Sequence, residues 1–311
     1  MGVSPERSHD LESGYASGAS SYPSLTTLAF TKPHLKHLNA QLSKLEPIDI
    51  LRWARLTLPN LYQTTAFGLS GLVTLDLLSK LQAEDPESPQ IDIIFLDTLY
   101  HFQQTLDLVE KVKVHYPNIN IHVYKPDGVE TASAFEERYG KKLWESKQDQ
   151  YDWVAKVEPA QRAYSELAVS AILTGRRRSQ GAKRSDLGVI EVDEAGLVKV
   201  NPMFNWSFGQ VQDYVRANNV PYNELLDLGY KSVGDWHSTQ PISEGEDERA
   251  GRWKGTQKSE CGIHNKRSKY AQFLMEQEMK AQQEQLSAAL HKVGITGKQL
   301  HQQKLHGTGQ I

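Results

Sequence analysis

Residues 61–96, LYQTTAFGLSGLVTLDLLSKLQAEDPESPQIDIIFL, decide the fold. Short strand-like runs alternate here with a longer stretch whose apolar residues recur at helical spacing, and the alternation continues to residue 124. Such a pattern predicts an α/β fold with a doubly wound, mostly parallel sheet that binds ligands at the carboxyl ends of its strands. The predicted elements are strands over residues 61–65, 91–96 and 119–124 and helices over residues 71–81 and 101–115.

Further elements flank this central pattern. Residues 1–25 are rich in Ser, Gly and Pro and predict a disordered leader. Residues 240–258 combine glycines with charges of both signs, and they predict a flexible tether with too few apolar residues to anchor itself to the core. The remaining predicted elements are helices over residues 34–45, 47–58, 132–144, 151–167 and 208–217, strands over 168–174, 189–192 and 197–200, and a helix that begins near 270 and frays in the Gln-rich sequence after it.

Composition narrows the class of protein. The 311 residues carry a formal net charge of −3, which argues against a nucleic-acid binder that works through overall positive charge, so an anion site must be a local basic cluster. No stretch has the length of an apolar membrane span, and residues 1–25 lack the apolar core of a signal peptide, so we expect a cytoplasmic protein. The single cysteine, Cys261, excludes an intrachain disulfide, a multi-cysteine zinc site and a cysteine-ligated iron–sulfur cluster.

Hydroxyl and glycine residues stand where the first predicted strand meets its helix. Residues 64–71, TTAFGLSG, include Thr64, Thr65, Gly68 and Ser70. Small residues at this point expose backbone N–H groups, and the helix dipole and the hydroxyls add further attraction for a phosphate-like group. The Gly-Lys-Ser/Thr ending of a Walker loop is absent, and a purely structural βα turn remains the alternative.

The second strand ends in Phe95-Leu96-Asp97-Thr98. Asp97 and Thr98 would face the same crevice as the first loop, because the carboxyl ends of parallel strands lie at one edge of the sheet. The alternative is that Asp97 caps the following helix.

A dense basic stretch follows a later strand. Residues 174–180, TGRRRSQ, together with Lys183 and Arg184, place five cations within nine positions. Guanidinium groups match phosphate oxygens bidentately, so Arg177, Arg178, Gln180 and Arg184 are candidates for binding an anion. The alternative is a solvated charged face.

Polar residues surround Cys261. A lone cysteine is often a small buried apolar side chain, but the neighbouring glycine and charges in residues 258–264, KSECGIH, oppose burial. His264 and the basic residues that follow favour the thiolate, which is the reactive form of cysteine. We therefore predict a reactive thiol.

Together these motifs resemble the phosphoadenylyl-sulfate (PAPS) reductases, particularly the fungal enzymes of assimilatory sulfate reduction. The likeness extends from about residue 61 to residue 266 and covers all four motifs. Its most specific element is residues 258–264, which resemble the family's K-x-E-C-G-[LI]-H signature around its nucleophile. Residues 229–238, GYKSVGDWHS, match the family's G-Y-x-S-V-G-D-x-H-[ST] segment, which contains Tyr230 and His237.

The resemblance implies a fold of the adenine nucleotide alpha-hydrolase-like type and a specific chemistry. In this family the cysteine, here Cys261, attacks the sulfate sulfur of PAPS, releases adenosine 3′,5′-bisphosphate and becomes S-sulfocysteine, and thioredoxin as electron donor then releases sulfite. Tyr230 is implied as a second catalytic group and His264 as the residue that holds the thiolate or the sulfonate. A homodimer is also implied. The implied substrate-binding residues are Thr64, Thr65, Gly68, Ser70, Asp97, Thr98, Arg177, Arg178, Gln180, Arg184 and His237.

Related adenylyl-sulfate reductases use the nucleotide without its 3′-phosphate, and they hold a [4Fe–4S] cluster with a Cys-Cys pair and a later Cys-x-x-Cys. Here the first position reads Tyr151-Asp152 and the second is residues 235–238, DWHS, so we expect no iron–sulfur cluster and no flavin. Two alternatives stay open, a cluster-free adenylyl-sulfate reductase and a non-catalytic nucleotide-binding regulator.

These assignments divide the chain into four parts. They are a disordered leader (1–25), an α/β nucleotide-binding domain with an N-terminal helical pair (26–239), a mobile catalytic segment (240–269) and a C-terminal helix with a polar tail (270–311). Neither a nucleic acid nor a membrane is expected as a partner.

Overall fold

The structure is a computed structural model that describes residues 28–181, 184–256, 258, 260, 262–263 and 269–292. The expected leader over residues 1–25 lies outside the described residues, as do Lys183, Cys261 and His264.

Six strands form one sheet in the order β3-β2-β1-β4-β6-β5. The pairs β1·β2, β2·β3, β1·β4 and β4·β6 are parallel, and only the edge strand β5 runs antiparallel to its neighbour β6. The prediction of a doubly wound, mostly parallel sheet is therefore confirmed. The strands are β1 (Leu61–Thr64), β2 (Ile93–Leu96), β3 (Ile121–Tyr124), β4 (Ala171–Leu173), β5 (Ile190–Val192) and β6 (Val198–Val200).

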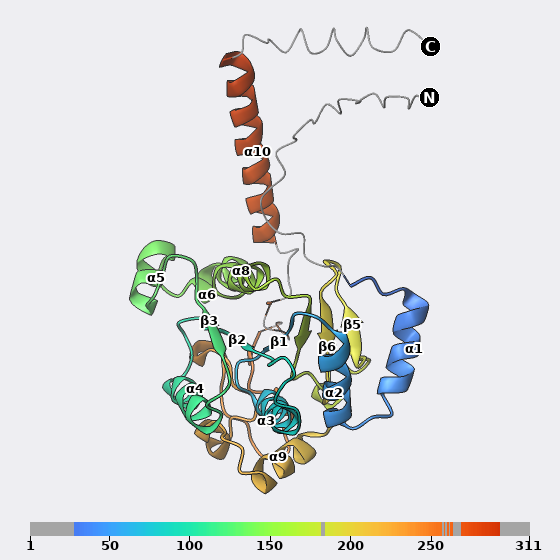
Figure 1. Ribbon diagram of the computed structural model, residues 1–311. Helices are drawn as coiled ribbons and strands as arrows, with labels where there is room; N and C mark the ends of the chain where they lie inside the picture. The colour runs from blue at the N-terminus through green and yellow to red at the C-terminus, as the bar shows by residue number, and fades with distance from the viewer. Residues whose placement is uncertain are drawn as a thin grey trace, which may run out of the picture.

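Helices cover both faces of the sheet (Figure 1). In this view α2, α3, α4 and α9 lie on one side of the sheet and α8 on the other, where it contacts β2 and β3. The helices on the first side and at the N-terminus are α1 (Lys32–Leu42), α2 (Pro47–Thr57), α3 (Leu69–Glu84), α4 (Gln103–His115) and α9 (Phe208–Ala217). Those after β3 are α5 (Ala132–Tyr139), α6 (Leu143–Ser146), α7 (Gln148–Asp152), the π-helical turn η1 (Trp153–Val157) and α8 (Glu158–Glu166). Short 3₁₀ turns are η2 (Arg178–Gln180), η4 (Glu224–Leu228) and η5 (Trp236–Ser238).

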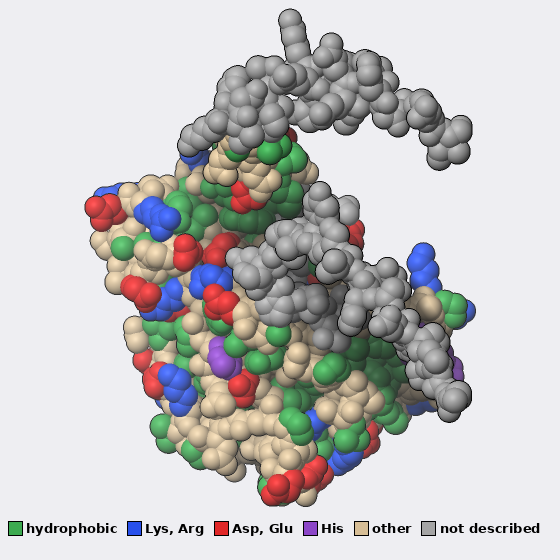
Figure 2. Space-filling model, turned by 45° about the horizontal axis from the view of Figure 1, so that its top comes forward, with side chains coloured by type: hydrophobic (Ala, Val, Ile, Leu, Met, Phe, Trp, Pro, Cys, Tyr) green, Lys and Arg blue, Asp and Glu red, His purple; other side chains and the backbone are tan. Residues whose placement is uncertain are grey.

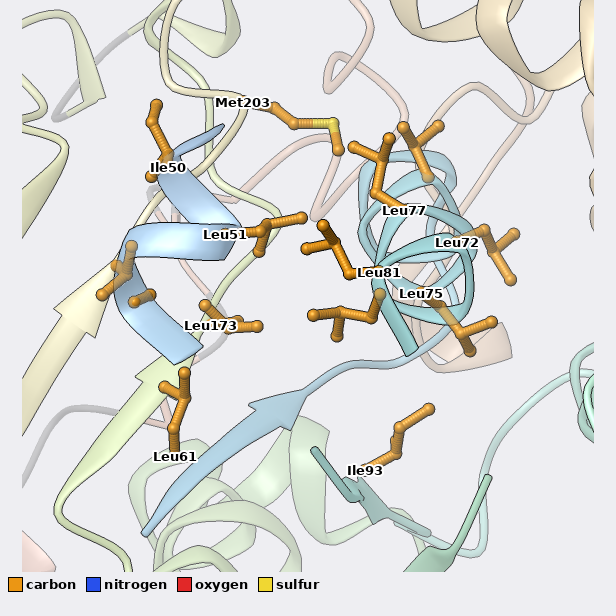
Figure 3. Close-up of a cluster of buried hydrophobic side chains, with 14 of the residues drawn as sticks. Ile50, Leu51, Leu61, Leu72, Leu75, Leu77, Leu81, Ile93, Leu173 and Met203 are labelled. Atoms are coloured by element: carbon orange, nitrogen blue, oxygen red, sulfur yellow. The ribbon is translucent and has the colours of Figure 1, made fainter. Parts of the chain in front are cut away.

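The strands divide their side chains between two cores. Ile93 and Phe95 of β2 pack with the helices of the first side, whereas Ile94 and Leu96 pack against α8, as the period-two alternation of a strand requires. Figure 3 shows the larger core, in which Leu51 of α2 and Leu81 of α3 approach each other above the sheet. Each fully buried leucine contributes roughly 1.5–3 kcal/mol of hydrophobic free energy, so these layers hold the strand ends in place.

Two predicted helices differ from the structure. The helix expected over residues 132–144 is broken at Gly140, which has a φ of 95°. The helix expected over 151–167 begins as α7, passes through the π-helical turn η1 and continues as α8. Periodicity of apolar residues cannot reveal such a turn, because it changes the hydrogen-bond pattern within a continuous helical run.

The stretch expected to be a flexible tether is anchored to the core over residues 240–256. Trp253 is 6% exposed, and the backbone N–H of Gln240 donates to the carbonyl of Gly251 at 2.9 Å. The carboxylate of Glu248 is also buried and pairs with Arg177. The prediction was wrong here because it counted apolar residues and overlooked ion pairs as anchors.

The C-terminal helix α10 (Lys269–Lys292) projects from the body of the molecule (Figure 1). The expected fraying after its first turn is wrong up to Lys292, because Gln, Glu, Lys, Ala and Met all favour helix even without burial. Residues 293–311 lie outside the described residues.

Charges of both signs are interspersed over the described part of the face in Figure 2. This distribution agrees with the small net charge and leaves any anion site to a local cluster. Among the described residues, no helix combines the length and the apolar character needed to cross a membrane.

Candidate active site

A cavity of about 1010 Å³ opens at the carboxyl ends of β1, β2 and β4. Thr64 and Thr65 reach it from β1, Thr98 from the loop after β2, and Thr174 and Gly175 from the loop after β4. The chain proceeds from β1 to β2 and β3 on one side of β1 and then crosses to β4 on the other side, so the cavity lies where the strand order reverses. Open α/β sheets bind their ligands at such a point.

The N-terminus of α3 forms one wall of the cavity. Gly68 is its N-cap residue and supplies no side-chain cap, so the first N–H groups of α3 point toward the cavity end of the helix. A Cβ at Gly68 would meet nothing within 4 Å, so the approach to this helix end is open. Thr65 Oγ1 accepts a hydrogen bond from the N–H of Phe67 at 2.9 Å, which shapes the turn before the helix. This wall suits an anion.

Arg177 lies at the cavity wall with its guanidinium fully engaged. Nε donates to Ser70 Oγ at 2.8 Å, and one terminal nitrogen donates to Ser179 Oγ at 2.7 Å and to the carbonyl of Trp206 at 3.3 Å. The other terminal nitrogen donates to both carboxylate oxygens of Glu248, at 2.8 and 2.6 Å. All three nitrogens of this guanidinium thus donate hydrogen bonds within the protein. The Arg177 guanidinium therefore cross-links several parts of the chain while it borders the cavity. Its predicted contact with a phosphate stays a prediction.

Arg184 and Gln180 do reach the cavity. Arg184 forms a bidentate pair with Glu260 at 2.8 and 2.6 Å, and it also donates to the side-chain oxygen of Gln180. Burial alone would raise the pKa of Glu260, but the hydrogen bonds and charge of Arg184, with the charge of Arg249, hold that pKa below its usual range. Glu260 is thus an anion bound to the cluster that was predicted to bind a ligand.

Three predicted binding residues do not line the cavity. Asp97 Oδ1 accepts from the N–H of Leu99 at 2.9 Å and so stabilises the turn after β2. Arg178 Nε donates to the carbonyl of Leu187 at 2.7 Å and stays behind the cavity wall. His237 lies in an adjoining aromatic cluster.

The side chain of His237 is buried and stacks on Trp144, with ring centroids 4.0 Å apart and an interplanar angle of 9°. Its Nε2 lies 3.1 Å from the hydroxyl of Tyr151. Burial lowers the pKa of His237 to about 4, with a further lowering from the charge of Lys156 and a partly opposing effect of Asp235. His237 is therefore neutral at pH 7, and its predicted contact with the substrate stays a prediction.

Asp235 is the centre of a buried polar network next to the cavity. It accepts hydrogen bonds from Thr98 Oγ1 at 2.6 Å and from the hydroxyl of Tyr151 at 3.0 Å, and its Oδ2 lies 2.7 Å from Lys156 Nζ. Burial opposes ionisation, yet the charge and hydrogen bonds of Lys156, with Thr98, hold the pKa of Asp235 far below its usual range. Thr98, a predicted site residue, is thus held at the cavity by an ionised carboxylate.

Tyr230 and several cations complete the described walls. The Tyr230 ring packs edge-on against Phe102 and borders the cavity. The basic side chains in the lining are Lys156, Arg176, Arg177, Arg184, Lys231, Arg249, Arg252 and Lys258. An otherwise acidic chain therefore concentrates positive charge in one place.

Residues 260, 262 and 263 also line the cavity. Gly262 has a φ of 81°, and a Cβ at this position would stand 2.6 Å from Asp152 Oδ2. The predicted catalytic residues Cys261 and His264 lie outside the described residues, but their described neighbours belong to the cavity wall.

Sequence reasoning did not single out Asp152, Lys156, Asp235 or Glu248 as site residues. Asp152 and Lys156 did carry a signal, because opposite charges at i and i+4 within an otherwise apolar helical stretch indicate a buried pair. Glu248 gave no comparable signal among the mixed charges around it. Within the described ranges, no group of three or more His, Cys, Asp or Glu side chains could hold a metal ion.

Comparison with known proteins was consistent across sequence and structure. Residues 60–241 match the family model of the phosphoadenosine phosphosulfate reductase domain. The chain is 63% identical over 279 residues to the phosphoadenosine phosphosulfate reductase of Emericella nidulans, which covers 90% of each chain. It is 58% identical over 249 residues to that of Saccharomyces cerevisiae, covering 78% of this chain and 94% of the relative.

A solved structure is also similar. The crystal structure of the phosphoadenylyl-sulfate (PAPS) reductase of Candida auris in complex with phosphate is 53% identical and superposes with a TM-score of 0.63, covering 69% of this chain and 100% of that one.

The buried pair of Arg177 and Glu248 predicts a large effect on stability. Arg177→Met should lower the free energy of unfolding by about 3–5 kcal/mol, because it leaves the Glu248 carboxylate buried without its partner. Arg177→Met combined with Glu248→Gln should lose less than the sum of the single variants. Urea unfolding measures both. Lys142→Met, which removes an exposed pair with Glu145, is the control, and equal losses in Arg177→Met and this control would contradict the assignment.

His237 predicts a pH dependence. The unfolded chain binds a proton at this imidazole near pH 6.5, whereas the folded chain binds it only near pH 4. Between these values the unfolded state holds more protons, so stability falls as the pH is lowered from about 6.5 to about 4. Melting temperatures should therefore drop over this window more steeply in the wild type than in His237→Gln. Parallel curves for the two proteins would show that His237 is not buried in its neutral form.

Proposed function

This chain belongs to the phosphoadenosine phosphosulfate reductase family, and we propose that it reduces PAPS to sulfite and adenosine 3′,5′-bisphosphate through Cys261 as nucleophile. The observation that carries this proposal is the composition of the cavity wall. Glu260 and Gly262, the residues on either side of Cys261 in the chain, line the same cavity as the N-terminus of α3 and the basic side chains.

The cavity offers both a helix N-terminus and basic side chains, and these suit the phosphate and sulfate groups of PAPS. The open N-terminus of α3 at Gly68 offers backbone N–H groups and the helix dipole to a phosphate or sulfate group. Arg184, Lys231, Arg249 and Arg252 offer positive charge around the rest of the cavity. Because all three nitrogens of Arg177 donate within the protein and Arg178 lies outside the lining, recognition of the 3′-phosphate is assigned to these other cations.

The proposed reaction has two steps. The Cys261 thiolate attacks the sulfonate sulfur, the bond between that sulfur and the bridging phosphate oxygen breaks, and the electron pair leaves with adenosine 3′,5′-bisphosphate. A thiolate of thioredoxin then attacks the sulfur of Cys261, and sulfite leaves with the electron pair of the S–S bond. The second thiol of thioredoxin resolves the mixed disulfide and restores Cys261. Two electrons thus pass from the dithiol to the sulfur that leaves as sulfite.

Tyr230 and His264 are proposed to assist. The Tyr230 ring borders the cavity, where its hydroxyl can donate to the transferring group, and His264 follows Cys261 by three residues and is proposed to hold the thiolate or the sulfonate. Thioredoxin as donor and a homodimer as the assembly remain proposals that follow from the family resemblance.

Substitutions of Gly68 and Gly71 in the phosphate loop, residues 64–71, should have contrasting effects. Gly68→Ala should keep its stability within about 1 kcal/mol of the wild type, because its Cβ meets no neighbour, but it should weaken binding of adenosine 3′,5′-bisphosphate by narrowing the approach to α3. Gly71→Ala should destabilise the fold by about 1–3 kcal/mol, because its Cβ would collide with Thr65 Oγ1. Calorimetric binding and unfolding curves separate the two, and normal affinity in Gly68→Ala would place the anion elsewhere.

The nucleophile can be identified by mass. Wild-type protein mixed with PAPS, without a reductant, should gain one sulfonate on the peptide that contains Cys261, and thioredoxin should remove it with release of sulfite. Cys261→Ser should form neither the adduct nor sulfite, yet bind adenosine 3′,5′-bisphosphate within a few-fold of the wild type. An adduct that persists in Cys261→Ser would reject this nucleophile. Faster adduct formation with adenylyl sulfate than with PAPS would instead favour an adenylyl-sulfate reductase.

A further inference from the structure

The carboxylate of Asp152 lies next to two residues of the segment over residues 240–269, called the C-terminal segment. Asp152 ends α7, is 8% exposed and borders the cavity. Its Oδ2 accepts a hydrogen bond from Lys258 Nζ, and the backbone of Gly262 lies so close that a Cβ there would stand 2.6 Å from the same oxygen. The same oxygen atom therefore hydrogen-bonds to Lys258 and leaves no room for a side chain at Gly262, four positions further along the chain.

A buried lysine links this carboxylate to Asp235. Lys156 Nζ lies 3.6 Å from Asp152 Oδ1 and 2.7 Å from Asp235 Oδ2, so one buried ammonium joins both acids. Lys156 belongs to the π-helical turn η1, whose wider winding begins directly after Asp152. Such turns occur frequently at functional sites. Lys156 thus connects the Asp152 carboxylate to the Asp235 network through charge, since Asp152 Oδ1 accepts no hydrogen bond from the described residues.

A carboxylate at this wall opposes the binding of an anion. Like charges a few ångströms apart repel, and the effect grows where water is excluded. Glu248 and Glu260 also border the cavity, but each is paired with arginine, whereas Asp152 is neutralised by lysines, one of which comes from the C-terminal segment itself. A buried acid next to an anion site therefore requires a role that offsets its cost, and its contacts supply one.

We propose that Asp152 is a positioning residue of the reductase reaction, which docks Lys258 and Gly262, two described residues on either side of the proposed nucleophile in the chain. This inference rests on the proposed function, since it assigns the effect of docking to the reaction of Cys261. Glu260, bound to Arg184, provides a second attachment between these two residues. Gly262 is required because any side chain would displace the carboxylate.

The test compares Asp152→Asn, Lys258→Met and the double variant with Asp92→Asn. Asp92 is a matched control, because it bonds to His122 and Asn120 at the opposite end of the sheet. The main measurement is the single-turnover rate at which saturating PAPS adds a sulfonate to the protein, followed by intact mass without thioredoxin. Affinity for adenosine 3′,5′-bisphosphate and the melting temperature are measured alongside it.

Both single variants should slow adduct formation about ten- to a hundred-fold, with nucleotide affinity within about threefold of the wild type. The double variant should be no slower than the slower single variant, because both remove the same contact. Rates that stay normal at saturation while only the melting temperature falls would overturn the proposal and leave Asp152 a purely structural residue. Loss of affinity in proportion to rate, or additive losses in the double variant, would also overturn it.

A second measurement is independent of the chemistry. Trypsin should cleave after Lys258 several-fold faster in Asp152→Asn than in the wild type or in Asp92→Asn, because the pair that shields this side chain is weakened. Unchanged cleavage would overturn the docking contact whatever the activity. If cleavage is faster but the wild type forms no adduct with PAPS, the proposed function fails while the docking contact stands.

Discussion

The guanidinium of Arg177 is the interaction on which the site depends. It binds the start of α3 through Ser70, the loop before α9 through the carbonyl of Trp206, and the C-terminal segment through Glu248. These elements are far apart in the sequence, and α3 and α9 also share the apolar core, so the Arg177 hydrogen bonds add a polar connection at the edge of the sheet. A planar fork with five donors can satisfy all of them at once in fixed geometry, which a lysine could not. The basic stretch after β4 thus builds the site as well as supplying charge to it.

Charge neutralisation explains how such a dense cluster of cations is tolerated without ligand. Arg177, Arg184 and Lys258 each pair with a carboxylate of the chain itself, so the cavity keeps a positive wall whose repulsion is largely cancelled. An incoming anion then competes with a carboxylate of this protein at Arg184, whereas the N-terminus of α3 offers its N–H groups without such competition. An anion that binds at the helix N-terminus therefore displaces no carboxylate, whereas an anion that binds at Arg184 does.

The sequence predicted the fold well because strand and helix periodicities are local. Residues 61–124 reveal three strands and two helices directly, and the basic stretch, the phosphate loop and Tyr230 all reach the cavity. The misses have another physical origin. Arg177 and Arg178 read alike in sequence, yet one is a cross-link and the other lies behind the wall, because a guanidinium's partner is decided by tertiary contacts. Glu248 pairs with Arg177 and Asp152 pairs with Lys258 over up to about a hundred positions, which no local pattern encodes, whereas the i, i+4 pair of Asp152 and Lys156 is local.

The ion pairs that attach the C-terminal segment to the rest of the chain become more exposed from Glu248 to Glu260. The side chains of Arg177 and Glu248 are 2% and 8% exposed, whereas those of Arg184 and Glu260 are 13% and 34% exposed. A buried ion pair costs much to break because each charge is left unsolvated, but a partly exposed pair can exchange its partner for water at little cost. We therefore expect Glu248 to stay fixed and any release of the segment toward a protein donor to begin beyond it. We also expect the part of the segment that moves to be shorter than the predicted residues 240–269, because the core holds Glu248 in place.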